Sequence, residues 1–67
     1  MNDIINQAMI KFPEANRASV EDVTKNYERL DFHAVTELPL LSAYFKWNGH
    51  TNMAIRYVLK QKSIQHK

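Results

Sequence analysis

Apolar residues recur at helical spacing in several separate segments of this 67-residue chain. Between residues 3 and 12 they stand at positions i, i+1, i+4, i+5 and i+8, and between residues 20 and 31 at i, i+3, i+7 and i+10. Each pattern places its apolar side chains along one side of an α-helix. Because so short a chain must bury these stripes against one another, the spacing predicts an all-α fold.

The ends of the first two helices are predicted from residues that cap or break helices. Pro13 ends the first helix, because the residue before a proline is pushed out of the helical conformation. Ser19 is the expected N-cap of the second helix, which should run from about residue 20 to residue 31. Residues 31–38 stay open between a helical turn, a short strand and an extended link.

Two further stripes lie in the second half of the chain. Residues 36–39 resemble a helix start with a proline in the first turn, and residues 40–45 carry the third stripe. Asn48 and Gly49 indicate a stop, because both residues tolerate the left-handed conformation that ends helices. Thr51 is the expected N-cap of a fourth helix, whose apolar residues lie between positions 53 and 59.

These elements predict one domain over residues 1–67. It should be a small bundle of about four short helices, with a helix-turn-helix-like αα unit at its C-terminus. The tail from about residue 62 is expected to fray, because nothing in the pattern holds it to the rest of the chain.

Composition argues against several classes of function. The chain has no cysteine and a single glycine, so it has neither a disulfide nor a glycine-rich phosphate loop. It is too short for a closed catalytic cleft, so we do not expect an enzyme. The three histidines are widely spaced, and neither a metal nor another cofactor is expected. No apolar run approaches the ~20 residues that span a bilayer, and a cytoplasmic protein is expected.

Charge is unevenly distributed along the chain. Residues 1–37 contain all seven acidic residues and four of the nine basic ones, a formal charge of −3, whereas residues 38–67 contain five basic residues and no acidic one. This asymmetry favours a C-terminal half that binds an anion or an acidic surface. The other reading is that the two halves attract each other, within one molecule or between two copies.

The last two predicted helices and the turn at residues 47–50 have the form of a helix-turn-helix unit. In such a unit the second helix lies in the major groove of DNA, where asparagine pairs with adenine and arginine with guanine. Asn52, Arg56 and Lys60 recur on one side of the fourth helix. We therefore expect a small regulatory protein that binds double-stranded DNA, with these contact residues: Lys46, His50, Thr51, Asn52, Arg56, Lys60 and Lys62.

Residues 48–54 read Asn-Gly-His-Thr-Asn-Met-Ala. They are similar to the Gly-Asn-x-Thr-x-x-Ala start of the helix-turn-helix unit in Fis-type bacterial DNA-binding proteins, and the resemblance implies the same use of this segment. It does not continue beyond Leu59. Phe45 departs from the general helix-turn-helix pattern, which has a small residue where the two helices approach.

A second hypothesis is a small protein–protein interaction module that docks on a host enzyme or kinase. Its expected anchors are Tyr44, Trp47 and Tyr57, because aromatic side chains contribute strongly to protein interfaces. For Trp47 the structural alternative is simple core packing. Under the DNA hypothesis we also expect a homodimer, since a second copy doubles a small phosphate footprint. The first helix, with its apolar stripe, is the candidate dimer element.

Overall fold

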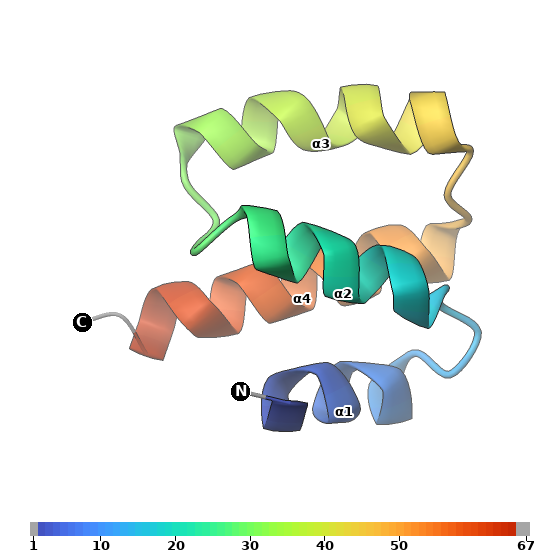
Figure 1. The fold of residues 1–67 in the computed structure, drawn as a ribbon, viewed down its shortest axis with the longest axis vertical. Coiled ribbons are helices and arrows are strands. Elements are labelled where there is room, and N and C mark those ends of the chain that lie inside the picture. Colours follow the sequence, from blue (N-terminus) through green and yellow to red (C-terminus); the bar gives the residue numbers. More distant parts are fainter. Residues whose placement is uncertain (1, 66–67) are drawn as a thin grey trace.

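The computed structural model of the chain describes residues 2–65, and the side chains of residues 3–64. The described residues form four α-helices and no strand: α1 spans Asn2–Lys11, α2 Arg17–Asn26, α3 Phe32–Phe45 and α4 Gly49–Gln65. Successive helices run in opposite directions, with α1 and α3 along opposite edges and α2 and α4 between them (Figure 1). The predicted small all-α bundle is therefore confirmed.

The core is built around α4. Ile55, Val58 and Leu59 are almost completely buried on the side of α4 that packs against α1 and α2. Burying one such side chain contributes about 1.5–3 kcal/mol relative to leaving it exposed. The other helices add the following buried apolar residues: Ile5 and Ala8 from α1, Val20 and Val23 from α2, and Ala34 and Leu38 from α3. The stripe of α1 is thus packed inside the molecule and is not available as a dimer surface while the helix stays in place.

An asparagine directly before the first residue caps both α2 and α4. The side chain of Asn16 accepts the N–H of Ser19 at 3.2 Å, and that of Asn48 accepts the N–H of Thr51 at 2.7 Å. The predictions of Ser19 and Thr51 as N-caps were therefore wrong. In each case the expected cap is the residue whose N–H the true cap binds.

Thr51 instead joins the starts of the two helices. Its hydroxyl is fully buried and accepts the backbone N–H of Asn16 at 2.8 Å. The side-chain amide of Asn48 also donates to the carbonyl of Glu14, at 3.3 Å. The first turn of α4 is consequently fixed to the loop between α1 and α2.

The open segment at residues 31–38 is helical. Asp31 caps α3 by accepting the N–H of Ala34 at 2.9 Å, and the helix continues to Phe45. Pro39 therefore lies inside α3 and not in its first turn. The second helix ends at Asn26, earlier than predicted, because Tyr27 takes an extended conformation.

The turn between α3 and α4 is made by a lysine. Lys46 adopts the left-handed conformation, with φ 56° and ψ 47°, and its N–H bonds the carbonyl of Ser42. Gly49 has no positive φ and is the first residue of α4. The predicted helix stop at Asn48–Gly49 was wrong in position, since α3 ends at Phe45 and Asn48 caps the next helix.

The C-terminal part of α4 is held to the segment that follows α2. The ammonium group of Lys62 donates to the carbonyls of Thr24 and Tyr27, at 2.9 and 3.0 Å. The hydroxyl of Ser63 accepts the N–H of Leu30 at 2.8 Å. The helix thus extends to Gln65, so the prediction that the chain frays from about residue 62 was wrong for residues 62–65; residues 66–67 lie outside the described part.

Among the described helices there is none with the length and apolar character needed to cross a membrane.

Candidate nucleic-acid interface

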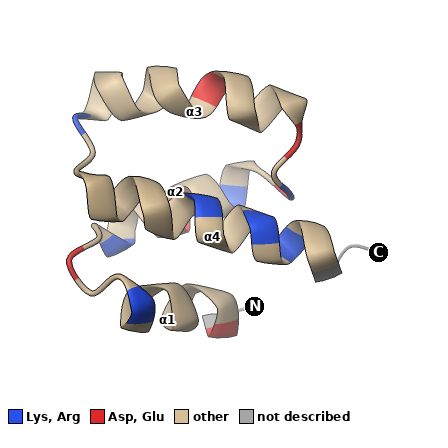
Figure 2. Ribbon diagram, turned by 180° about the vertical axis from the view of Figure 1, so that it is seen from behind, with Lys and Arg blue, Asp and Glu red and all other residues tan. Residues whose placement is uncertain are grey.

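Three polar residues follow one side of α4 in steps of four. Arg56 and Lys60 are exposed, and Asn52 is partly exposed on the flank that faces α3. The Lys and Arg positions of α4 lie in the foreground of Figure 2, on the side of the molecule away from α2. We call Asn52, Arg56 and Lys60 the α4 basic face.

No acidic side chain neutralises this face within the described part of the chain. α4 itself contains no acidic residue, and the ion pairs formed by described side chains all use acids at or before Glu37. None of these pairs includes Arg56 or Lys60. Both cations are exposed and unpaired, so they are free to bind an anion.

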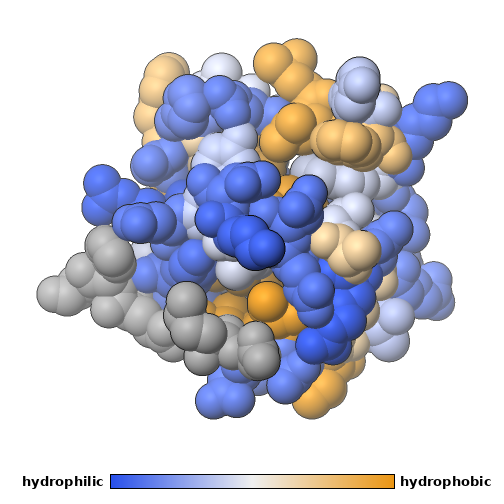
Figure 3. Space-filling view, viewed as in Figure 1, coloured by the Kyte–Doolittle hydropathy of each residue, from blue (hydrophilic) through white to orange (hydrophobic). Residues whose placement is uncertain are grey.

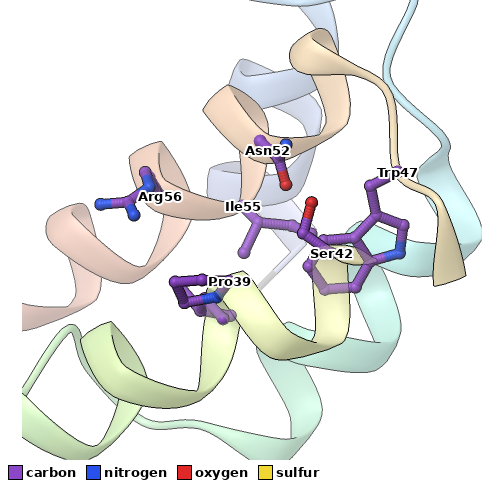
Figure 4. Close-up of a pocket in the computed structure, with 7 residues that line it drawn as sticks. Pro39, Ser42, Trp47, Asn52, Ile55 and Arg56 are labelled. Atoms are coloured by element: carbon purple, nitrogen blue, oxygen red, sulfur yellow. The ribbon is translucent and has the colours of Figure 1, made fainter. Parts of the chain in front are cut away.

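A shallow cleft of about 300 Å³ separates α3 from α4 beside the basic face. Asn52 and Ser42 point toward one another across it, and the side chain of Arg56 extends away from both (Figure 4). The lining residues are Leu38, Pro39 and Ser42 of α3, Trp47 of the turn, and Asn52, Ile55 and Arg56 of α4. The cleft thus combines one cation with two neutral hydrogen-bonding groups over an apolar floor.

Two residues predicted to contact DNA have other roles. Thr51 is fully buried and binds Asn16, so it has no surface with which to touch a base or a phosphate. Lys62 places its ammonium group on two carbonyls at the C-terminal end of α2, where positive charge favours the helix dipole. We therefore remove both from the candidate site.

The two remaining candidates lie near the start of α4. Lys46 is exposed and makes no ion pair with any described residue. The Nε2 atom of His50 is 3.6 Å from the carboxylate of Glu14, so a protonated His50 faces a negative charge of its own molecule. Of the two, Lys46 is consequently the better candidate for a contact with an anion.

Two of the three aromatic anchors of the alternative hypothesis belong to the core. Trp47 is half-buried, with its indole Nε1 buried and without a hydrogen-bond partner. Tyr57 is half-buried and packs edge-on against Phe12, with 6.3 Å between ring centroids. Only Tyr44 is exposed, beside Phe45 at a centroid distance of 4.8 Å. Trp47 therefore packs against the core, which was the alternative to its role as an anchor.

An apolar surface on α3 was not predicted. Apolar surface shows in separate spots over α3 in Figure 3. The exposed large apolar residues of this helix lie around it and not on one side: Phe32, Val35, Leu40, Tyr44 and Phe45. The signal in the sequence is that apolar residues occur on every side of residues 32–45, whereas a surface helix normally has a polar side. We missed it because residues 31–38 were not assigned to a helix.

The acidic residue of α3 is held at its flank. The hydroxyl of Tyr27 donates a hydrogen bond to the carboxylate of Glu37, which is also 2.8 Å from His33 Nε2. That hydrogen bond, followed by desolvation and by the negative charges of Glu37 and Asp31, raises the pKa of Tyr27 to about 12. Glu37 is thereby kept on the side of α3 that faces Tyr27.

No protein-family profile, no curated protein sequence and no solved structure matches this chain significantly.

Proposed function

We propose that this chain is a small protein that binds double-stranded DNA through the α4 basic face, with Lys46 as an additional phosphate ligand. The observation that carries the proposal is the pair Arg56 and Lys60, exposed, unpaired and one helical turn apart on a helix without an acidic residue. DNA attracts such cations because each one that reaches a phosphate releases a condensed counterion.

The shape of α4 suits a DNA groove. An α-helix with its side chains is about 10–12 Å across, and the major groove of B-DNA is about 12 Å wide. α4 is 17 residues long and its exposed side faces away from α2. Arg56 and Lys60 then reach phosphates, while the amide of Asn52 supplies the donor and acceptor that an adenine edge requires.

The binding should be weak and governed by charge. With Thr51 and Lys62 engaged inside the molecule, the described part of the C-terminal half offers three unpaired cations: Lys46, Arg56 and Lys60. Phosphate contacts carry no sequence information, so binding that rests on them has a dissociation constant of roughly 10⁻⁴ to 10⁻⁶ M at physiological salt.

The test is a titration of a fluorescent random-sequence duplex at low salt, followed by anisotropy. The double variant Arg56→Ala, Lys60→Ala should bind at least about tenfold more weakly than the unmodified chain. The matched control is Lys25→Ala, an exposed cation on α2 that should leave the affinity almost unchanged. Equal loss of binding in both variants, or no binding by the unmodified chain at low salt, would refute the proposal.

A further inference from the structure

The cleft between α3 and α4 contains hydrogen-bonding groups that the fold itself does not use. Ser42 and Asn52 are partly buried and point toward one another across it (Figure 4). Within the described part of the chain, neither side chain takes part in a hydrogen bond. By contrast, the hydroxyls of Thr51 and Ser63 each accept a backbone N–H from a distant part of the sequence. The two polar groups of the cleft are therefore available to a ligand.

The floor of this cleft is apolar, and its size is that of a small-molecule site. Leu38 and Ile55 form its base, and Pro39 and the half-buried Trp47 stand beside them. The volume is about 300 Å³, at the lower end of the ~300–1,000 Å³ range of ligand sites, which are mostly apolar with a few placed polar groups. Such a volume holds roughly one or two aromatic rings. A folded protein or a DNA duplex is too large to enter it.

The charge of the cleft is positive and lies at one end. Arg56 is exposed, has no ion partner among the described residues and extends away from Ser42 and Asn52 (Figure 4). No acidic residue is found among the described residues that line the cleft. A matching ligand therefore has an anionic group at one end, an apolar body and a hydrogen-bonding group at the other end.

A carboxylate suits this cation better than a phosphate does. The planar guanidinium of arginine binds a carboxylate through two parallel hydrogen bonds. Arg56 also balances the one negative charge of a carboxylate, whereas a phosphate monoester carries about −1.5 to −2. Since Arg56 is the only basic residue among the described residues that line the cleft, an aromatic acid fits it better than a nucleotide.

We propose that the cleft binds a small aromatic carboxylate with a hydrogen-bonding substituent opposite its carboxylate. The carboxylate pairs with the guanidinium of Arg56, and the ring covers Ile55. The substituent lies between Ser42 and Asn52, where a phenolic hydroxyl both donates and accepts a hydrogen bond. The ligand thereby supplies the partners that these three polar side chains lack.

Occupation of the cleft has a consequence for DNA binding. Asn52 and Arg56 belong both to the cleft and to the α4 basic face. The acid and a DNA duplex therefore compete. An acid at ten times its own dissociation constant should raise the apparent dissociation constant for DNA about tenfold. This competition rests on the function proposed above, whereas the binding of the acid rests on the cleft alone.

Binding of the acid is tested without DNA, by an NMR titration of the labelled chain with para-hydroxyphenylacetate. Its dissociation constant should be roughly 0.1–10 mM, as expected for a ligand of this size. The signals that shift should be those of residues 38–42 and 52–56 and of Trp47, the single tryptophan of the chain. No shift at a concentration above that range, or shifts of the same size in α1, would overturn the proposal.

A variant with a matched control tests the pairing with Arg56. Arg56→Gln should weaken the binding of the acid at least about tenfold, because a charge-assisted pair is lost. Lys60→Gln removes an exposed cation one turn further along α4 that does not line the cleft, and it should leave the affinity for the acid almost unchanged. The neutral amide of the same acid should bind the unmodified chain as weakly as the acid binds Arg56→Gln. Equal weakening by the two substitutions would overturn the proposal.

The other end of the ligand is tested by removing one hydroxyl from each partner. Ser42→Ala should weaken the binding of para-hydroxyphenylacetate severalfold, because the hydrogen bond to the phenolic hydroxyl is lost. The same variant should bind phenylacetate, which lacks that hydroxyl, as well as the unmodified chain does. Equal effects on the two acids would contradict the orientation of the ligand.

A competition experiment separates this proposal from the proposed function. At constant ionic strength, para-hydroxyphenylacetate should displace a fluorescent duplex from the unmodified chain. DNA binding that depends on Arg56 and Lys60, together with no binding of the acid, refutes the cleft ligand alone. Binding of the acid without displacement of bound DNA, or without any DNA binding, refutes the proposed function alone.

Discussion

Replacing Thr51 by valine removes one buried hydrogen bond and little else. The Thr51 hydroxyl is fully buried in the first turn of α4 and accepts the N–H of Asn16 at 2.8 Å. Valine has nearly the same shape, so the packing of this turn is retained. The N–H of Asn16 then loses its acceptor, at the residue that also caps α2 through its side chain.

The expected loss follows from that unpaired donor. A buried N–H left without a partner costs about 1–3 kcal/mol, and the lower half of that range applies because the bond is only partly buried. A domain of this size has a total free energy of unfolding of roughly 3–10 kcal/mol, so the change is a substantial part of it. Each kcal/mol lowers Tm by about 4–8 °C in a domain this small.

The assay is urea unfolding, followed by circular dichroism at one fixed protein concentration. Thr24→Val is the matched control. The Thr24 hydroxyl donates to the Val20 carbonyl of its own helix, so its removal leaves no N–H unpaired and should change stability by less than about 0.5 kcal/mol. A Thr51→Val chain as stable as the unmodified one would show that the bond to Asn16 contributes nothing.

Three further predictions concern the turns and the ends of the helices. Lys46→Gly should have a free energy of unfolding in urea about 1 kcal/mol higher than Lys46→Ala, because glycine adopts the left-handed conformation of residue 46 without strain. Both variants lose the same charge, so equal stability would contradict this. Since the pKa of Tyr27 is raised from 10.0 to about 12 in the folded chain, its contribution to stability is complete below pH 10 and disappears as the pH rises toward 12. Tyr27→Phe should flatten that decline in pH-dependent unfolding, and an unchanged decline would exclude this cause. Lys62→Met should lower stability by about 1 kcal/mol with little effect on DNA affinity, whereas Lys60→Met should do the reverse, as parallel unfolding and anisotropy measurements would reveal.

The helical stripes could be predicted from sequence, but the choice of N-cap could not. Around each helix start two residues three positions apart are both good caps, Asn16 and Ser19 in one case and Asn48 and Thr51 in the other. The Thr51 hydroxyl is engaged by Asn16, 35 positions away, so it is unavailable as a cap. Local preference cannot reveal a contact of that kind.

α3 escaped prediction for a different reason. Its apolar residues lie on every side, so no single stripe defines a helical register. Pro39 then suggested a helix start, because proline is common in the first turn and disfavoured later. The helix nevertheless begins at Phe32 and is capped by Asp31, whose carboxylate accepts the N–H of Ala34. The exposed apolar surface follows from this longer helix.

The candidate site was partly predictable. The charge asymmetry left two readings open, and in the structure Arg56 and Lys60 are exposed and take no part in the ion pairs of the described residues. It could not show that Lys60 is exposed whereas Lys62 binds backbone carbonyls of its own molecule. Lys62 meets two carbonyls that are 35 and 38 positions away in the sequence.

Binding of DNA by the α4 basic face is tested most directly by the salt dependence of duplex affinity. For one copy with three phosphate-binding cations, we predict that the logarithm of the association constant falls with the logarithm of salt concentration at a slope of about −3. The double variant Arg56→Ala, Lys60→Ala keeps only Lys46 and should give a slope of about −1. An identical slope for the two proteins would show that Arg56 and Lys60 do not reach DNA phosphates.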